Sequence, residues 1–253
     1  MLILKPRSVP RYSKEDGEGS YLASASDLMI GLLFIFIILV VVLALEQRRQ
    51  EATLDAVKGA ADPRASVTEV IGEELKRAKL DVRVDPASGV ISLPSDTLFA
   101  LGSSSLSASA SQAIRDARER LALVLPCYVA SERSHVTGQQ CANNRGGHEI
   151  DTIFLEGHTD NVANTKPGGN LGLSFDRARA IQQVLLGEGS PLVPMRNSAQ
   201  QPIFSYSAYG ADRLLPGVDG TSAQNRRVDL RIVLKYQSIN ETLEHLKRVE
   251  GGG

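Results

Sequence analysis

The clearest hydrophobic pattern in the chain is one long apolar run over residues 21–45. Within it, residues 28–45 are 18 consecutive uncharged positions, most of them Leu, Ile, Val or Phe. About 20 apolar residues in a helix span the roughly 30 Å hydrocarbon core of a bilayer. A buried helix of a soluble protein is rarely this long and this uniformly aliphatic. The pattern therefore predicts a transmembrane helix over residues 21–45.

The rival interpretation of this run is a cleaved secretory signal peptide, with Val42 and Ala44 before the cleavage site. The apolar region of a signal peptide has about 7–15 residues, whereas this run is longer and begins beside an acid, Asp27. An uncleaved signal anchor is the preferred interpretation. Residues 1–20 then form a short cytoplasmic tail, although Arg48 and Arg49 after the helix leave the orientation open by charge alone.

Asp27 is the one acid inside the predicted span. An aspartate at the centre of a spanning helix costs about 2.5–3.5 kcal/mol, and less near the interface. Removal from water favours the neutral acid, so Asp27 is a candidate proton carrier. Ala23, Ser24 and Gly31 lie at i−4, i−3 and i+4 and leave this face small enough for another helix to approach closely. The open alternative is an aspartate that snorkels to the interface or lies just outside the span.

Hydrophobic periodicity predicts the elements downstream of the span. Residues 46–61 are charged and favour a helix, so they continue the membrane helix as a stalk until Asp62-Pro63 ends it. Apolar residues at helical or alternating spacing mark the remaining elements. The expected helices are 64–80, 106–124, 175–186 and 238–249, and the expected strands are 82–84, 90–93, 152–155, 203–209 and 228–234. Residues 126–149 are expected to form a loop.

This order of elements predicts an α/β (α+β) fold in which the helices cover one face of the sheet, a βαβαββ sandwich. The resulting domains are a tail (1–20), a transmembrane helix (21–45), a periplasmic stalk or linker (46–80), a folded domain (81–237), a C-terminal helix (238–250) and three glycines that look like a cloning remnant (251–253). At 253 residues the chain has room for one membrane helix and one domain of common size.

Composition narrows the possible functions. The net charge of −1 and the absence of a basic stripe give no signal for nucleic-acid binding. Cys127 and Cys141 are an even count in a chain with a signal anchor, and they predict one disulfide, with two unpaired cysteines as the alternative. They do not predict a zinc site, because no nearby pair of histidines completes four ligands.

Arg177 is a candidate anion-binding residue. Ser174 is a natural N-cap for the helix expected over residues 175–186, and Arg177 then stands where a capping box has Glu or Gln. A cation in the first turn opposes the helix macrodipole, so helix stability does not explain Arg177. Its guanidinium suits bidentate capture of a carboxylate, and the helix N-terminus adds backbone donors. The alternative is a structural salt bridge to Asp160 or Asp176.

Three blocks of sequence resemble the OmpA-like peptidoglycan-binding family. They are Leu-Glu-Gly-His-Thr-Asp at 155–160, Asn-Leu-Gly-Leu-Ser-Phe-Asp-Arg-Ala at 170–178 and Asn-Arg-Arg-Val at 225–228, and the resemblance covers about residues 90–235. It implies a periplasmic domain that grips the diaminopimelate-containing stem peptide of the cell wall. Asp160 would hold the ammonium group of the ligand and Arg177 its carboxylate. The other residues implied at the site are Thr159, Asn170, Asn225 and Arg226, and Arg227 would be either a framework residue or solvent-facing.

The helix and the domain together resemble the B subunits of ion-driven stator complexes, which include flagellar MotB and, more remotely, ExbD and TolR. The match at the helix is Ala-Ser-Asp-Leu-Met at 25–29, with Asp27 in the ion-carrying position. Flagellar members usually have an aromatic residue just before the acid. Ser26 at this position, and the cysteine-bearing insertion, are closer to the ZorB family of the Zorya anti-phage defence motor.

This second resemblance implies a single-pass protein of the bacterial inner membrane, with a cytoplasmic N-terminus and a periplasmic domain. Its partners would be a second copy of the chain, a ring of MotA- or ZorA-like A subunits, and peptidoglycan. The carried ion would be H⁺, with Na⁺ also possible. The alternatives are a flagellar stator subunit, a passive wall anchor with Asp27 as an assembly contact, and a transport energiser, which would normally lack the OmpA-like blocks.

Catalytic and metal chemistry have little support in the sequence. His158 beside Asp160 is a weak metal signal, and no G-x-S-x-G motif surrounds Ser174. We therefore expect no enzyme activity, no resident metal and no cofactor.

Overall fold

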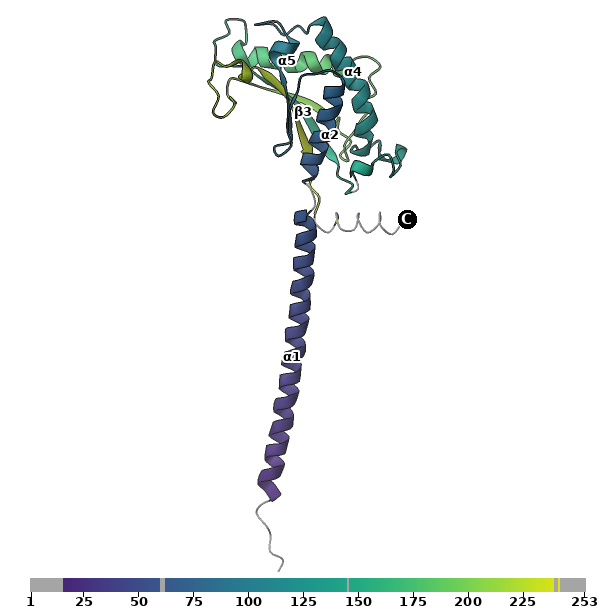
Figure 1. The fold of residues 1–253 in the computed structure, drawn as a ribbon, viewed down its shortest axis with the longest axis vertical. Helices are drawn as coiled ribbons and strands as arrows, with labels where there is room; N and C mark the ends of the chain where they lie inside the picture. Colours follow the sequence, from purple (N-terminus) through teal and green to yellow (C-terminus); the bar gives the residue numbers. More distant parts are fainter. Residues whose placement is uncertain (1–15, 60–61, 145, 239–240, 242–253) are drawn as a thin grey trace, which may run out of the picture. The chain divides into compact units, whose positions relative to one another are not determined.

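A computed structural model describes residues 16–59, 62–144, 146–238 and 241 (Figure 1). The chain divides into two units, Met1–Gly59 and Ala60–Gly253. Each unit is described by itself below. Most of the C-terminal helix expected over residues 238–249 and all of the glycines at 251–253 lie outside the described residues.

The first unit contains one helix, α1, over Asp16–Gly59. Its segment Ser26–Arg48 is 23 residues long with a mean hydropathy of 3.5, which is long and apolar enough to cross a membrane. The aliphatic side chains of this segment are exposed on all sides of the helix, as expected where lipid or another protein is the natural surrounding. The expected transmembrane helix lies inside α1, and α1 continues through the predicted stalk to Gly59.

The second unit combines a five-stranded sheet with four α-helices among its described residues. The helices are α2 (Pro63–Arg77), α3 (Ser95–Leu98), α4 (Ala108–Val124) and α5 (Gly169–Leu185). The strands are β1 (Arg83–Asp85), β2 (Val90–Pro94), β3 (Ile150–His158), β4 (Phe204–Gly210) and β5 (Arg227–Leu234). Four 3₁₀ turns complete the unit: η1 (Leu125–Cys127), η2 (Arg133–His135), η3 (Ala142–Asn144) and η4 (Ala223–Asn225).

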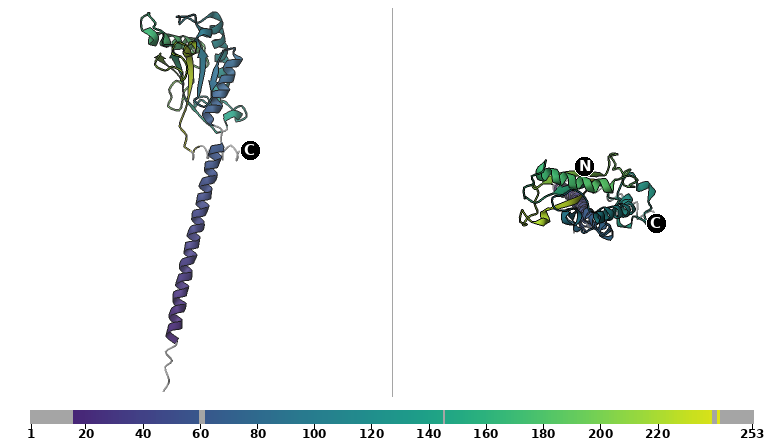
Figure 2. Two further views of the ribbon diagram at one scale, coloured as in Figure 1. Left: turned by 60° about the vertical axis from the view of Figure 1, so that its left-hand side comes forward. Right: turned by 90° about the horizontal axis from the view of Figure 1, so that it is seen from above.

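The strand order in the sheet is β1-β2-β5-β3-β4. β3 and β4 run parallel, and the other neighbours run antiparallel. The fold is therefore of the mixed α+β class, as the order of elements predicts. This unit can be followed from two further directions in Figure 2.

The two faces of the sheet differ because side chains alternate along each strand. Leu155 of β3 pairs with Leu230 of β5 on the buried apolar face, and Glu156 pairs with Asp229 on the other face. α5 packs on the apolar face, where Gly157 meets the backbone of Ser174. α2 packs on the same face, through its contact with Val84 of β1. The prediction that the helices share one face therefore holds for α2 and α5.

The predicted boundary between stalk and domain at residue 80 is wrong. Val67, Ile71 and Leu75 of α2 are buried in the core, because their spacing places one apolar stripe of the helix against the sheet. Asp62-Pro63 begins this helix as well as following the previous one. The Asp62 carboxylate accepts a hydrogen bond from the Arg64 N–H at 2.9 Å, and Pro63 fills the first helical position.

The predicted start of α5 at residue 175 is also wrong. The helix begins at Gly169 after a left-handed N-cap at Gly168. Ser174 is therefore an interior residue of the helix. Its hydroxyl donates to the Leu171 carbonyl at 2.8 Å and accepts from the Gly210 N–H at 3.0 Å. Ser174 thus links α5 to β4 and caps neither end of the helix.

The remaining boundaries differ from the predicted ones by small amounts. β3 is longer than the expected strand, and β1 begins one residue later than expected. α4 begins at Ala108, where the hydroxyl of Ser107 caps the Ala110 N–H. The short helix α3 is not anticipated from the sequence.

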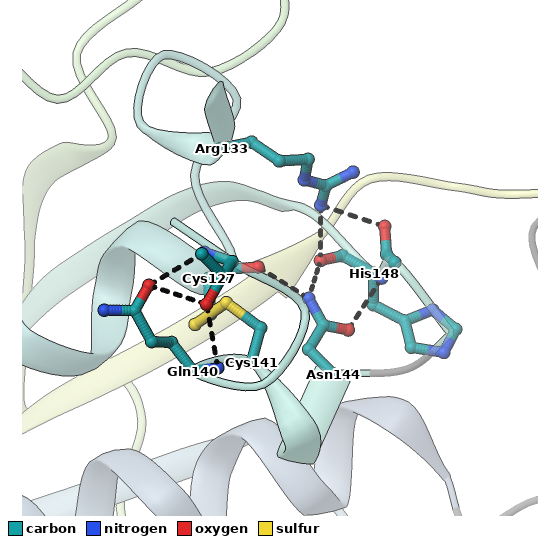
Figure 3. The surroundings of a disulfide bond; sticks show 8 residues. Cys127, Arg133, Gln140, Cys141, Asn144 and His148 are labelled. Carbon is teal, nitrogen blue, oxygen red and sulfur yellow. Dashed lines mark hydrogen bonds between the residues drawn. A yellow bond between two sulfur atoms is a disulfide. The ribbon is translucent and has the colours of Figure 1, made fainter. Parts of the chain in front are cut away.

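Cys127 and Cys141 form the predicted disulfide (Figure 3). It closes the long loop before β3, and a buried asparagine holds the same loop from inside. The Asn144 side chain donates to the carbonyls of Cys127 and His148 at 2.7 and 2.8 Å, and it accepts from the His148 N–H. The Arg133 guanidinium donates to the His148 carbonyl from outside at 3.0 Å.

Replacing Gly157 with alanine is expected to lower the free energy of unfolding by roughly 1–3 kcal/mol. A Cβ atom at this position would lie 1.9 Å from the Ser174 carbonyl oxygen, so β3 and α5 would have to separate. The measurement is chemical denaturation of the full-length protein in detergent. Gly138→Ala is the matched control, because a Cβ there meets no atom within 4 Å. Equal stability of the two variants would contradict this close packing.

Removing the disulfide with the double substitution Cys127→Ser and Cys141→Ser should lower the free energy of unfolding by about 3 kcal/mol, the chain-entropy value for a loop of about 15 residues. Denaturation is compared with and without a reducing agent. The reductant should destabilise the wild type and leave the double variant unchanged. A wild type that is insensitive to reduction would contradict a stabilising role of the disulfide.

Candidate functional site

The candidate site lies where the ends of three strands meet. The end of β3 at His158 pairs with the start of β5 at Arg227, and the end of β2 at Pro94 pairs with Arg227 from the other side. Loops 95–107, 159–168 and 211–226 emerge at this end of the sheet. The residues expected to bind the cell wall come from these loops and from α5.

Asp160 and Arg226 form the centre of the site. Asp160 is 7% exposed, and its Oδ2 accepts a hydrogen bond from Nη1 of Arg226 at 2.6 Å. The other two nitrogens of the Arg226 guanidinium form a bidentate pair with Asp96, with Nη2–Oδ2 at 2.7 Å and Nε–Oδ1 at 3.1 Å. Hydrogen bonds to Asp96 and then to Asp160 raise the pKa of Arg226 above its usual range. One permanently charged guanidinium therefore bridges two carboxylates.

Arg177 of α5 is close enough to Asp96, Asp160 and Arg226 to feel their charges, and it is almost fully buried, at 1% exposure. Its Nε donates to the Ser103 carbonyl at 3.0 Å, and its guanidinium lies 5.4 Å from the centre of the Phe99 ring. Its Nη1 is buried with no hydrogen-bond partner among the described residues. Burial lowers the pKa of Arg177, and the nearby carboxylates of Asp96 and Asp160 partly offset that effect.

The sequence interpretation of Arg177 needs one correction. Because α5 begins at Gly169, Arg177 is not in the first helical turn, and the macrodipole argument does not apply to it. Among the described residues, Arg177 also forms no salt bridge with Asp160 or Asp176, so the structural alternative is not what the structure shows. Arg177 is instead a buried cation with one N–H donor that lacks an acceptor among the described residues.

Residues 99–106 form a strap that contacts Arg177 through Phe99 and Ser103. Arg177 holds it through the Ser103 carbonyl, and Lys166 holds it through the Gly102 carbonyl, with Nζ–O at 2.6 Å. Gly102 has a positive φ of 66°, which an L side chain rarely adopts, and Leu101 is 83% exposed. The ends of the strap are anchored by the buried Phe99 and its bridge to Leu106, and two basic side chains hold the backbone of its middle part.

The other residues expected at the site differ in their roles. Thr159 is 2% exposed, and its hydroxyl has no partner among the described residues. The Asn170 side chain donates to the carbonyl of Asp160 at 3.2 Å and so fixes the turn that carries the carboxylate. Asn225 is fully buried and braces the 211–226 loop through the Asp219 carbonyl and the Leu215 N–H, each at 2.8 Å. The two asparagines therefore position the loops of the site.

Arg227 is a framework residue, which settles the two alternatives left open by the sequence. It is 7% exposed, with Nε donating to Asp229 at 3.0 Å and Nη2 to the Arg213 carbonyl at 3.3 Å. Asp96, Phe99 and Lys166 are not anticipated from the sequence. None of them belongs to a motif, and only the fold brings them beside Asp160 and Arg177.

A buried polar cluster lies on the face of the sheet opposite to α5. Potential ligand atoms of Glu156, His158 and Asp229 lie within 4.8 Å of one another. Arg231 pairs with Glu156 at 2.9 Å and Arg227 pairs with Asp229 at 3.0 Å, so each carboxylate already has a cation. A divalent ion there would lie next to two guanidinium groups, which does not favour a metal site.

His158 belongs to this cluster and not to the Asp160 site. Its Nε2 lies 3.3 Å from Oδ2 of Asp229, and its ring stacks on Tyr209 at 5.3 Å. Burial opposes ionisation of Asp229, but the hydrogen bond with His158 and the charge of Arg227 outweigh it and lower the pKa of Asp229. The weak His158–Asp160 metal signal of the sequence therefore has no geometric basis.

A cavity of about 370 Å³ adjoins the site on this polar face. Its lining includes Asp81, Arg83, Ser92, Asp96 and Arg227. Asp96 thus borders the cavity and also holds Arg226.

Comparison with known proteins gives structural neighbours without a sequence match. No protein-family model matches the chain, and no curated protein matches it significantly. A MotB-like protein from Desulfovibrio vulgaris is similar at 20% identity and a TM-score of 0.40, covering 69% of this chain and 94% of that chain. The periplasmic domain of Helicobacter pylori MotB gives 19% identity and a TM-score of 0.37, covering 63% and 82% of the two chains.

The OmpA-like domain of FopA1 from Francisella tularensis is also similar, at 16% identity and a TM-score of 0.32, covering 58% of this chain and 77% of that chain. The structural neighbours are thus MotB-like and OmpA-like domains. At these identities and TM-scores, the similarities assign no function to the chain.

Proposed function

We propose that this protein is a cell-wall-anchored subunit of an ion-driven motor in the bacterial inner membrane. In this proposal α1 spans the membrane and carries protons through Asp27. The second unit, which lies in the periplasm, binds the stem peptide of peptidoglycan and performs no catalysis of its own. The observation that supports the wall-binding part is the buried Arg177, which has a guanidinium N–H without an acceptor and lies in the same cluster as Asp160.

An unfilled guanidinium donor inside a protein is costly, because the charged group has lost water without gaining a full set of partners. An incoming carboxylate would satisfy it with a charge-assisted hydrogen bond. Asp160 lies in the same cluster and can hold a cation. The site therefore suits a ligand with a carboxylate and an ammonium group on one carbon, which is the free end of a diaminopimelate side chain.

Access to Arg177 requires the strap of residues 99–106 to move, since Arg177 is 1% exposed. Buried Phe99 and its bridge to Leu106 anchor the two ends of the strap, so only its middle, held by hydrogen bonds from Lys166 and from Arg177 itself, would need to move. The ligand carboxylate would replace the Ser103 carbonyl on Nε, or it would bind the open Nη1 beside it. The choice of diaminopimelate as the ligand rests on the resemblance of the motifs to those of OmpA-like domains.

The motor part of the proposal depends on Asp27. Two copies of the chain would place two Asp27 carboxyls inside a ring of A subunits, and each would take up a proton and release it on the other side. The available driving force is about 2.3 kcal/mol per charge per 100 mV. We prefer an anti-phage motor of the Zorya type, because Ser26 precedes the acid and a disulfide-bearing insertion is present. A flagellar stator subunit is the second candidate.

Asp160→Asn should weaken binding of diaminopimelate-containing peptide by about 10- to 100-fold, since a hydrogen bond to a charged group contributes roughly 1.5–3 kcal/mol. Arg177→Lys should weaken it comparably, because lysine lacks the planar fork. Binding is measured by calorimetry on the full-length protein in detergent. Asp116→Asn is the matched control, since Asp116 lies on α4 and bonds only Gln112 among the contacts described. Unchanged affinity in Asp160→Asn would exclude this site.

Asp27→Asn should abolish motor function and leave wall binding intact, because the amide cannot take up a proton. The measurement is phage plaquing and swimming motility in cells that carry the gene with its neighbours. Loss of phage protection with normal motility supports the defence motor, and loss of motility supports the flagellar candidate. If neither phenotype depends on Asp27, a passive wall anchor becomes the better account.

A further inference from the structure

In this structure the cation site on Asp160 is already occupied by the chain's own Arg226. We propose that Arg226 is an internal substitute for the ligand's ammonium group. Because a ligand must displace Arg226 from Asp160 to bind, the site selects zwitterionic ligands over simple amines. The inference rests on the proposed wall-binding function. It assigns Arg226 a role opposite to that of a ligand contact, because Arg226 competes with the ligand for Asp160.

The geometry allows Arg226 to leave Asp160 without losing its other partner. Only Nη1 bonds Asp160, whereas Nη2 and Nε both bond Asp96 in a fork. The Arg226 side chain is 18% exposed and the Asp96 side chain is 49% exposed, so the released Nη1 can reach water. Displacement therefore exchanges one charge-assisted hydrogen bond and leaves two in place.

The charge balance of the cluster explains the selectivity. Asp96 and Asp160 carry two negative charges, and Arg177 and Arg226 carry two positive charges, so the cluster is neutral. A simple amine bound to Asp160 would add one positive charge without a counter-charge. This is unfavourable because Arg177 and Asp160 are both buried. A zwitterion adds no net charge, and its carboxylate fills the open donor of Arg177. Only the second kind of ligand compensates for the displacement of Arg226.

This mechanism predicts what removal of Arg226 does. In Arg226→Gln the cluster has a net charge of −1, and no internal cation competes for Asp160. Diaminopimelate should then bind at least as tightly as to the wild type, and an amine without carboxylates should gain the most. If Arg226 instead positioned Asp160 or contacted the ligand, the same substitution would weaken the binding of diaminopimelate.

The experiment compares diaminopimelate with 1,5-diaminopentane, which is the same carbon chain without its two carboxylates. Calorimetry on the full-length protein in detergent gives the ratio of the two affinities. The wild type should bind diaminopimelate much more tightly than the diamine, whose weak affinity is obtained at high diamine concentration. In Arg226→Gln the preference for diaminopimelate should fall by about tenfold or more, the effect of roughly one charge-assisted hydrogen bond.

Two further variants separate competition from general electrostatics. Arg83→Gln removes the same charge from a residue that lines the adjoining cavity and bonds neither Asp160 nor Asp96 among the contacts described. It should leave the preference within about twofold of the wild type, because exposed charges are strongly screened. Asp96→Asn leaves Arg226 with Asp160 as its only charged partner and should weaken the binding of diaminopimelate.

An unchanged preference in Arg226→Gln, or an equal change in Arg83→Gln, would overturn the inference while leaving the proposed function intact. Loss of diaminopimelate binding in Arg226→Gln, with an unchanged melting temperature, would also overturn it and make Arg226 a ligand contact. If neither the wild type nor Arg226→Gln binds diaminopimelate, the proposed wall-binding function fails, and this inference fails with it.

Discussion

The close contact between β3 and α5 is the constraint on which the candidate site depends. Gly157 has no side chain, so the Ser174 backbone can approach it to a distance that any Cβ atom would prevent. Asp160 follows Gly157 by three residues, and Arg177 follows Ser174 by three residues. The same contact therefore sets how close the carboxylate on the strand end lies to the guanidinium on the helix. Ser174 adds a second link, through its hydroxyl to the Gly210 N–H of β4.

Patterns of local sequence predict the elements of this protein well, but they locate helix ends poorly. The apolar run in α1 and the alternating β5 strand are visible because their causes lie within a few neighbouring residues. Asp62-Pro63 is ambiguous, since the same pair can end one helix and begin the next. Ser174 is a good N-cap by residue type, yet the chain starts α5 earlier, at Gly168, and uses the hydroxyl for a tertiary contact.

The site could be predicted from the sequence only in part. Asp160 and Arg177 are recognisable because their residue types suit ammonium and carboxylate binding and because they lie in recognisable blocks. The premise about the first helical turn was wrong, although Arg177 does lie in the site. Asp96 could not have been found, because a single aspartate after a short strand carries no signal until the sheet brings β2 beside β5. Asn170 and Asn225 brace loops in the structure, a role that a motif alone does not distinguish from binding.

The two carboxylates at the centre of the proposed function meet the same physical requirement in different surroundings. An isolated carboxylate in a membrane or a protein interior is costly, so it is stable there only with a cation or a proton. In the proposed motor, the partner of Asp27 is a proton that comes and goes. Asp160 is paired with the Arg226 guanidinium in the described structure, and the ligand's ammonium would replace it.

An anchor that resists the torque of a motor needs a long-lived contact with its wall ligand, and residence time is where most affinity differences between related complexes arise. In the proposed site, the exchangeable internal cation would serve selectivity and not affinity, because it competes with the ligand for Asp160. It would keep the empty site neutral, so simple amines would gain nothing by entering. A bound zwitterion would be held at two points, by Asp160 and by Arg177. Both contacts would have to break for release, and this two-point attachment would be the source of slow dissociation.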